Sequence, residues 1–198
     1  SSYSSQLQNA LSDDPDTLLI IGYPESGVRI LRDFYSGFDR NDMDVLVSDG
    51  LQDGDLPESV GRDMSNVRGT APLGAGPGVD FFNQQFEEVY DEPPEGPFLR
   101  QAYDAAAVLV LAYAASENGD GPGVRDNMRT VTEGDGEEIT PETLVDGIEA
   151  AANGDDIVYK GVSGPVAFDD NGDLASATYD YFRFTSEGDI ESIDQVTP

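Results

Sequence analysis

The first quarter of the chain carries a hydrophobic pattern that predicts a strand, a helix and a second strand. Residues 17–21 form a continuous run of branched apolar side chains, which is typical of a buried strand. A turn with proline at residues 22–25 ends this run and opens a helix, whose apolar residues recur every three or four positions as far as Phe38. Residues 44–47 predict a second short strand, which the turn at 48–50 ends.

This order of elements predicts that two polar side chains lie together. A strand, a helix and a strand within about 35 residues form a right-handed crossover, so the two strands should be parallel neighbours about 5 Å apart. Open parallel sheets bind ligands outside the carboxyl ends of their strands, which is where Tyr23 and Asp49 stand. Asp49 can accept hydrogen bonds from a cationic group, and the phenol of Tyr23 can donate, accept or stack on it. The alternative at this point is an ordinary Asp-Gly turn beside a surface aromatic residue.

The rest of the chain continues the mixture of helices and short strands. The glycine-rich residues 73–78 lack both the Lys-Ser/Thr ending of a phosphate-binding loop and the GxGxxG spacing, so they predict a linker or hinge. Residues 98–115 form the most apolar helix, and its centre is apolar on every side. Such a helix should be packed on most of its circumference within a layered α/β body. Residues 166–168, an Asn-Gly turn and residues 177–185 predict a hairpin.

Two acidic stretches need separate interpretation. Residues 132–139 predict an acidic loop. The cluster Asp169, Asp170, Asn171 and Asp173 invites a calcium site, but its glycine comes too early and no glutamate follows at the twelfth position of an EF-hand loop. A hairpin turn is therefore favoured over a metal site.

The composition is dominated by carboxylates. Forty Asp and Glu residues stand against ten Lys and Arg, which gives a net charge of -30. Such self-repulsion is tolerable in molar salt, where the screening length falls to about 3 Å. We therefore expect a protein of an extreme halophile, and the near absence of lysine, which occurs only at Lys160, resembles halophilic archaeal proteomes. The charge excludes nucleic acid and anionic membrane surfaces as direct partners.

The absence of cysteine and histidine removes several chemistries. Thiolate nucleophiles, disulfides, Ser-His-Asp triads and zinc sites with the usual ligands are excluded, so we expect neither a metal nor a cofactor. No apolar run is long enough to span a bilayer. An enzyme would have to be a carboxylate-based hydrolase, and nothing in the spacing of the acids selects a catalytic pair.

Three stretches carry a resemblance to a known family. Residues 4–51 are similar to a lobe with strand, helix, strand and an Asp/Glu-Gly turn, and residues 98–116, with the sequence AYDA at 102–105, look like a long helix of the other lobe. Residues 160–173 (KGVSGPVAFDDNGD) match a return segment of the form Gly-x-x-Gly-Pro-x-x-Phe-Asp-x-x-Gly-Asp. In this order they resemble the C-terminal half of a type I periplasmic-binding-protein fold, in the leucine/isoleucine/valine-binding group of ABC-transporter substrate-binding proteins.

The resemblance implies an α/β fold with three-layer lobes built on parallel sheets, present here only as its C-terminal half. Residues 1–76 would be the later part of lobe two, residues 77–156 the helical part of lobe one, and residues 157–198 the closing strands and return segment across the hinge. The strands and loops that begin each lobe are absent from these 198 residues. Half of the ligand site would then be missing, and strand edges would stay unpaired unless a second copy covers them in a homodimer.

The function that the resemblance implies is binding and not catalysis. Such a protein is the extracellular receptor of an ABC importer for a branched-chain amino acid or a similar small amphiphile, and its partner is the ABC permease. It would be anchored at the outer face of the cell membrane through an upstream segment. In this family the residue at Asp49 binds the α-ammonium group of the ligand, the residue at Tyr23 contacts the ligand from lobe two, and the residue at Phe98 lines the side-chain pocket. The alternative is a ligand sensor of the same fold, such as an amide or urea receptor.

Overall fold

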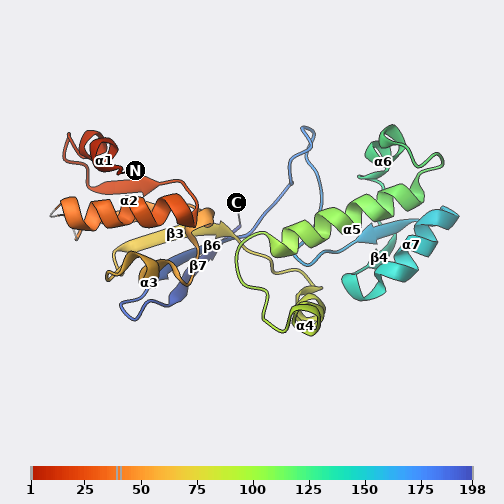
Figure 1. Ribbon diagram of the computed structural model, residues 1–198. Coiled ribbons are helices and arrows are strands. Elements are labelled where there is room, and N and C mark those ends of the chain that lie inside the picture. The colour runs from red at the N-terminus through yellow and green to blue at the C-terminus, as the bar shows by residue number, and fades with distance from the viewer. Residues whose placement is uncertain (1, 39, 41, 198) are drawn as a thin grey trace. The chain divides into compact units, whose positions relative to one another are not determined.

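The structure is a computed structural model that describes residues 2–38, 40 and 42–197, and it divides into two compact units. The first unit comprises Ser1–Pro72 and Tyr179–Val196, and the second comprises Leu73–Thr178 and Thr197–Pro198. In Figure 1 the first unit is the red to yellow part together with the blue strands β6 and β7, and the second is mainly green and cyan. Each unit has its own hydrophobic core.

The first unit is built on a five-stranded mixed sheet with the order β1-β2-β3-β6-β7. The first three strands are parallel, and the last two run antiparallel to their neighbours. Leu18 lies opposite Val45, so the predicted parallel pairing of the first two strands is confirmed. The strands are β1 (Thr17–Ile20), β2 (Asp44–Val47), β3 (Val67–Pro72), β6 (Tyr179–Phe184) and β7 (Ile190–Val196).

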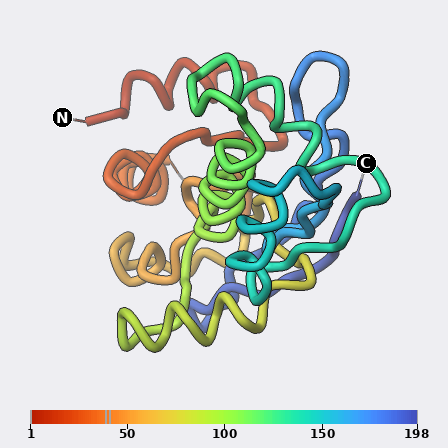
Figure 2. The backbone as a smooth tube through the Cα atoms, turned by 90° about the vertical axis from the view of Figure 1, so that its right-hand side faces the viewer, coloured from red at the N-terminus to blue at the C-terminus, as the bar shows by residue number. Residues whose placement is uncertain are grey.

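Three helices cover one face of this sheet, namely α1 (Ser4–Ala10), α2 (Pro24–Gly37) and α3 (Leu56–Val60), as the tube in Figure 2 also shows. Strand side chains alternate between the two faces, so β1 turns Leu18 and Ile20 into the core. From α2, Leu31 and Phe34 reach the same core and are fully buried. The sequence predicted this helix from its apolar spacing, and α2 ends at Gly37, one residue before the predicted end at Phe38.

The opposite face of β1 and β2 is apolar and open. Leu19 is 61% exposed, and Ile21 and Leu46 are also exposed. Strand β1 is the edge of the sheet. A shallow groove of about 200 Å³ follows this edge, and its lining from α1, β1 and α2 carries no charged side chain. In a chain with forty carboxylates, an uncharged apolar edge stands out from the rest of the surface.

In the second unit, helices α5, α6 and α7 pack with a two-stranded sheet around one core, and α4 contacts the 3-10 turn that precedes α7. Helix α5 lies beside α7 in both views, and these two enclose a core with Leu111, Ile139 and Tyr159. The elements are α4 (Val79–Tyr90), α5 (Leu99–Ala115), α6 (Gly121–Asn127), β4 (Glu137–Ile139), a 3-10 turn (Pro141–Thr143), α7 (Leu144–Asn153) and β5 (Ile157–Tyr159). Strands β4 and β5 are parallel.

Helix α5 is less enclosed than its sequence predicts. One face is buried, with Leu111 and Ala112 fully covered. The other face is apolar but open among the described residues, because no described element of this unit covers it. Its exposed residues are Ala102, Ala105, Ala106, Leu109, Val110 and Tyr113. The prediction that α5 is packed on most of its circumference is therefore wrong for one of its two faces within this unit.

Two local predictions are wrong. Residues 166–168 and 177–185 do not form a hairpin, because the second segment contributes β6, which pairs with β3 and β7 instead. Phe168 makes only an isolated bridge to Leu174. Residues 132–139 are not entirely a loop, because 137–139 form β4. Its two glutamates are exposed and only Ile139 is buried, so the acidic composition of this segment led to the prediction of a loop.

Gly69 in β3 generates a test of this packing. A Cβ at this position would overlap the buried ring of Phe182 and come within 2.8 Å of Val47 Cγ2. We expect Gly69→Ala to lower the free energy of unfolding by about 1–3 kcal/mol through overpacking. The matched control is Gly37→Ala at the end of α2, where nothing lies within 4 Å of the new Cβ. Urea unfolding in molar KCl measures both, and equal midpoints would contradict the packing described here.

Candidate functional site

The turns that carry Tyr23 and Asp49 are tied together at the carboxyl ends of β1 and β2. The Ser48 amide donates to the Ile20 carbonyl at 3.1 Å, which continues the ladder past the end of the strands. The Gly22 amide then donates to Ser48 Oγ at 3.4 Å. These bonds hold the two turns side by side, as expected from parallel strands that end at the same edge of a sheet.

Gly50 brings the ring of Tyr23 next to the Asp49 turn. A Cβ on Gly50 would lie 2.5 Å from the Gly22 carbonyl oxygen and 3.1 Å from Tyr23 Cδ1, so the ring stands directly against this glycine. Tyr23 is 75% exposed, and Asp49 is partly exposed. The structure therefore places the ring of Tyr23 beside the turn that carries Asp49, at an exposed end of the two strands.

Local sequence chemistry explains why each turn is fixed. Tyr23 precedes α2, where Pro24 occupies the first helical position, and Ser26 Oγ donates to the Tyr23 carbonyl at 3.1 Å. Asp49 begins a 3-10 turn (Asp49–Leu51) that ends on a fully buried leucine. Leu51 packs so closely over Gly27 of α2 that a Cβ on this glycine would overlap it. The core of the first unit thus anchors the Asp49 turn against the helix that Tyr23 opens.

Phe98 belongs to the second unit. It precedes α5 with a left-handed backbone, φ 70°, and its carbonyl accepts the Ala102 amide at 2.8 Å. Its ring is 45% exposed at the start of the helix. Tyr23 and Asp49 belong to the first unit, and Phe98 belongs to the second.

Asp180 is a second carboxylate near the Asp49 turn that sequence reasoning missed. It lies in β6 opposite Ala71, is 8% exposed, and accepts hydrogen bonds from Ser192 Oγ and from Gln52 Nε2, the latter at 3.5 Å. Gln52 directly follows the Asp49–Leu51 turn. A signal was present, because Asp180 has the same strand parity as the buried Phe182 and Phe184.

Asp104 is the most buried carboxylate of the described residues, at 2% exposure in α5 of the second unit. It accepts hydrogen bonds from Tyr159, Val162 and Ser163. Burial of the phenol, with the neighbouring charge of Asp104, raises the pKa of Tyr159 well above its ordinary value, so this hydroxyl stays a donor. The signal in the sequence was a single acid inside the most apolar helix.

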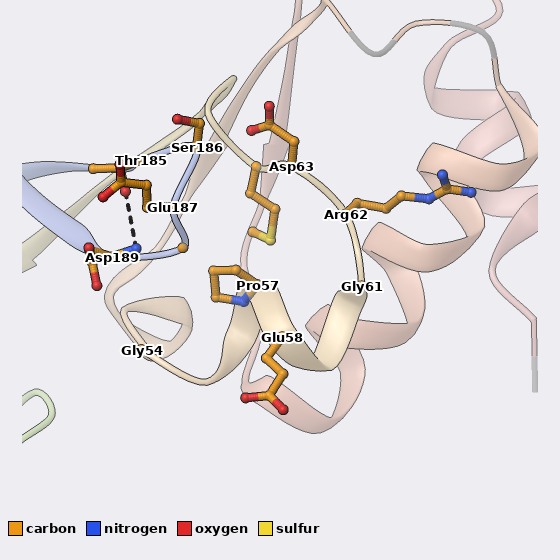
Figure 3. Close-up of a pocket in the computed structure, with 12 residues that line it drawn as sticks. Gly54, Pro57, Glu58, Gly61, Arg62, Asp63, Thr185, Ser186, Glu187 and Asp189 are labelled. Atoms are coloured by element: carbon orange, nitrogen blue, oxygen red, sulfur yellow. Dashed lines mark hydrogen bonds between the residues drawn. The ribbon is translucent and has the colours of Figure 1, made fainter.

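A polar pocket of about 540 Å³ lies at the other end of the first unit's sheet (Figure 3). It is formed by residues 54–64 around α3 and by the β6–β7 turn at 185–189. In Figure 3 the Arg62 side chain extends away from that turn. Because β3 begins and β6 ends here, the pocket is at the amino-terminal edge of the parallel strands, and neither Tyr23 nor Asp49 lines it.

The acidic cluster in the return segment forms a turn through Asp169. Its carboxylate accepts the amides of Asn171 at 2.8 Å and Asp173 at 3.0 Å, and its own amide donates to the Asp173 carbonyl. The Asp173 amide, followed by the Asn171 amide, holds the pKa of Asp169 below its ordinary value. Arg129 donates to the carbonyls of Phe168 and Asp169 and so closes the turn from α6's side of the unit. Among the residues that the structure describes, no group of three or more acidic side chains is arranged to hold a metal ion.

A family model identifies the family to which this α/β fold belongs. The model described as "Periplasmic binding protein" matches residues 1–189, so the chain belongs to this family.

Solved structures show the same fold. A leucine-binding protein from Thermotoga maritima matches with a TM-score of 0.70 at 22% identity, over 100% of this chain and 49% of that one. A branched-chain amino acid transporter substrate-binding protein from Streptococcus pneumoniae, in complex with isoleucine, matches with a TM-score of 0.66 at 18% identity, over 96% and 48%. A fatty acid ABC transporter substrate-binding protein from Thermomonospora curvata gives 0.58 at 13% identity, over 98% and 46%.

These comparisons establish family and fold. The chain spans about half the length of the structures that it matches. No protein of curated function is similar enough in sequence to be matched. Within the ranges that the structure describes, no helix has both the length and the apolar character needed to cross a bilayer.

The Asp169 turn generates a test. We expect Asp169→Ala to increase hydrogen exchange of the Asn171 and Asp173 amides several-fold, because both lose their acceptor. Because the pKa of Asp169 is lowered in the folded protein, the ionised carboxylate stabilises the turn at pH values above its ordinary pKa of 3.8. This stabilisation is lost as the pH falls through the lower pKa of the folded state. The control is Asp170→Ala at the adjacent exposed position. Equal exchange in the two variants, measured by mass spectrometry, would show that Asp169 does not hold the turn.

Proposed function

We propose that this chain is part of the extracellular receptor of an ABC importer, and that the receptor binds a branched-chain amino acid or a similar small amphiphile between two lobes. The observation that supports this most strongly is the pairing of Tyr23 and Asp49 on one rim. Family membership and the named relatives supply the class of ligand. The ligand sensor of the same fold shares this geometry and would be separated from a transporter by the absence of a permease partner.

Each site residue has a defined task in this proposal. Asp49 neutralises the α-ammonium group of the ligand, Tyr23 stacks on it or accepts from it, and Phe98 lines the pocket for the ligand's side chain. Molar salt screens charges at an open surface. Closure of two lobes removes water and restores the attraction between ammonium and carboxylate. An anionic amphiphile such as a fatty acid would meet the same carboxylate unfavourably, so Asp49 favours a ligand with a cationic group.

The open apolar faces fit a larger receptor. We propose that further polypeptide covers the β1 edge and the exposed side of α5, either from the remainder of a protein of the relatives' length or from a second copy of this chain. The relatives are about twice as long as the matched region, which favours the first arrangement. The intact receptor would stand at the outer face of the membrane, tethered by an upstream segment, where the permease reads its closed form.

Asp49 provides the direct test of the ligand site. In the intact protein in molar KCl, we expect Asp49→Ala to weaken binding of leucine, isoleucine or valine by more than tenfold, because a charge-assisted hydrogen bond contributes about 1.5–3 kcal/mol. Calorimetry with a panel of amino acids and one fatty acid measures this and identifies the ligand. The control is Glu25→Ala, which removes an exposed carboxylate from the first turn of α2 in the same unit.

The assignment has a defined point of failure. If Asp49→Ala leaves affinity within about 0.5 kcal/mol of the unchanged protein, Asp49 does not bind the ammonium group. Turnover of an amide or glycoside by the intact protein would replace the receptor with a carboxylate-based enzyme.

We further propose that the protein functions in molar salt. Its carboxylates outnumber its cationic side chains by four to one, and the ion pairs in the described part of the chain all lie at least partly exposed. Repulsion among the remaining carboxylates destabilises the compact state at low salt and is screened at high salt.

The salt dependence of unfolding tests this proposal. We expect the urea midpoint to rise steeply as KCl increases from about 0.1 M to about 2 M, because the screening length falls across this range from roughly 10 Å to below 3 Å. Replacing three exposed carboxylates, Glu92→Gln, Glu95→Gln and Glu117→Gln, should reduce the slope. A midpoint that does not depend on KCl would remove the case for a halophilic protein.

A further inference from the structure

The Asp104 carboxylate has its full complement of hydrogen bonds although it is buried in the second turn of α5. Two bonds on each oxygen occupy the acceptor positions of a carboxylate, which offsets the free energy of removing the charge from water. On Oδ1 the donors are the Tyr159 hydroxyl at 2.8 Å and the Val162 amide at 2.7 Å, and on Oδ2 they are the Ser163 amide at 2.7 Å and the Ser163 hydroxyl at 2.5 Å.

The loop at 161–164 connects this carboxylate to a second segment. The amides of Val162 and Ser163 donate to Asp104, while their carbonyls accept from the opposite direction. The Val162 carbonyl accepts the Gly76 amide at 2.8 Å, and the Ser163 carbonyl accepts the Ala75 amide at 3.3 Å. Two consecutive residues therefore link Asp104 to residues 75–76 through backbone hydrogen bonds. Hydrogen bonds in such a chain polarise and strengthen one another.

Two glycines allow α5, the loop at 161–164 and residues 75–76 to approach one another closely. A Cβ on Gly161 would overlap the carboxylate of Asp104. A Cβ on Gly76 would overlap the Gly161 carbonyl oxygen and lie 2.7 Å from the Gly164 amide nitrogen. The glycine-rich segment that the sequence predicted as a linker is thus held tightly against the loop within the second unit.

Residues 73–76 directly follow the boundary between the units, which lies after Pro72. The chain leaves the first unit after Pro72 and returns to it at Tyr179, and these two residues pair in the sheet of the first unit. Within the second unit, the Leu73 amide donates to the Thr178 carbonyl at 2.8 Å. Residues 73–76 are therefore the part of the second unit from which the first crossing starts.

We propose that Asp104 is a positioning residue for movement between the units. Through the loop at 161–164 it holds residues 73–76 as a rigid part of the second unit, so bending at the first two crossings is confined to the backbone beside Pro72 and Tyr179. The chain crosses a third time between Val196 and Thr197. This inference rests on the proposed receptor function, because a hinge matters only to a protein that closes around its ligand. If Asp104 served stability alone, its loss would affect the core of α5 and leave residues 75–76 as they are.

Hydrogen exchange of the intact protein distinguishes these roles without a ligand. Asp104→Asn keeps the shape of the side chain but turns an amide group toward N–H donors. We expect it to increase exchange at Gly76 by at least about tenfold. Asp180→Asn, which alters the buried carboxylate of the first unit, should leave Gly76 unchanged. Unchanged Gly76 exchange in a folded Asp104→Asn variant would overturn the proposal.

Two milder variants keep the test decisive if Asp104→Asn does not fold. Tyr159→Phe and Ser163→Ala each remove one hydroxyl donor from the carboxylate and keep the backbone donors. Each should increase Gly76 exchange by a smaller factor than the loss of the whole acceptor. Exchange that stays unchanged in both would overturn the proposal.

A distance measurement tests the hinge itself. The chain has no cysteine, so Glu187→Cys in the first unit and Asn118→Cys in the second give unique, exposed positions for spin labels. We expect Asp104→Asn to broaden the distance distribution of the ligand-free protein, and an unchanged width would overturn the hinge role. If amino acids fail to shift the distance in the unaltered protein while Gly76 responds to Asp104→Asn, the receptor function fails and the positioning of residues 73–76 stands.

Discussion

The parallel pairing of β1 with β2 is the constraint on which the candidate site depends. Its register is set by the core, because Leu18 and Val45 lie opposite each other and both point into the apolar layer under α2. A slip of one residue would turn these side chains into solvent and bring their exposed neighbours inward. The same pairing places the last residues of the two strands, Ile20 and Val47, opposite each other. The packing of the core therefore decides, several residues away, that Tyr23 lies beside the turn that carries Asp49.

How far the sequence predicted the structure depended on how local each feature is. The strand, helix and strand around Tyr23 and Asp49 follow from patterns within about 35 residues and from the handedness of the crossover. The hairpin prediction failed because the partner of β6 is β3, more than a hundred residues earlier, and nothing in the local pattern of Tyr179–Phe184 reports that partner. Asp104 was passed over for the same reason, since its donors lie more than fifty residues away.

The distribution of charge separates two kinds of surface. Acidic residues occur in nearly every segment, yet they avoid the outer face of β1 and the open side of α5. Such uncharged faces have the composition of protein interior, and each belongs to a different unit with its own core. This distribution supports the proposal that further polypeptide covers these two faces in the intact protein.

The contact between Gly76 and the loop at 161–164 also limits how the chain can vary in length. Surface loops usually tolerate inserted or deleted residues. Here an insertion that moved any residue other than glycine into the position of Gly76 would place a Cβ against the carbonyl oxygen of Gly161. The loop around Gly76 is therefore limited in length by a backbone about 85 positions further along the chain, although by its sequence alone it would look like a tolerant loop.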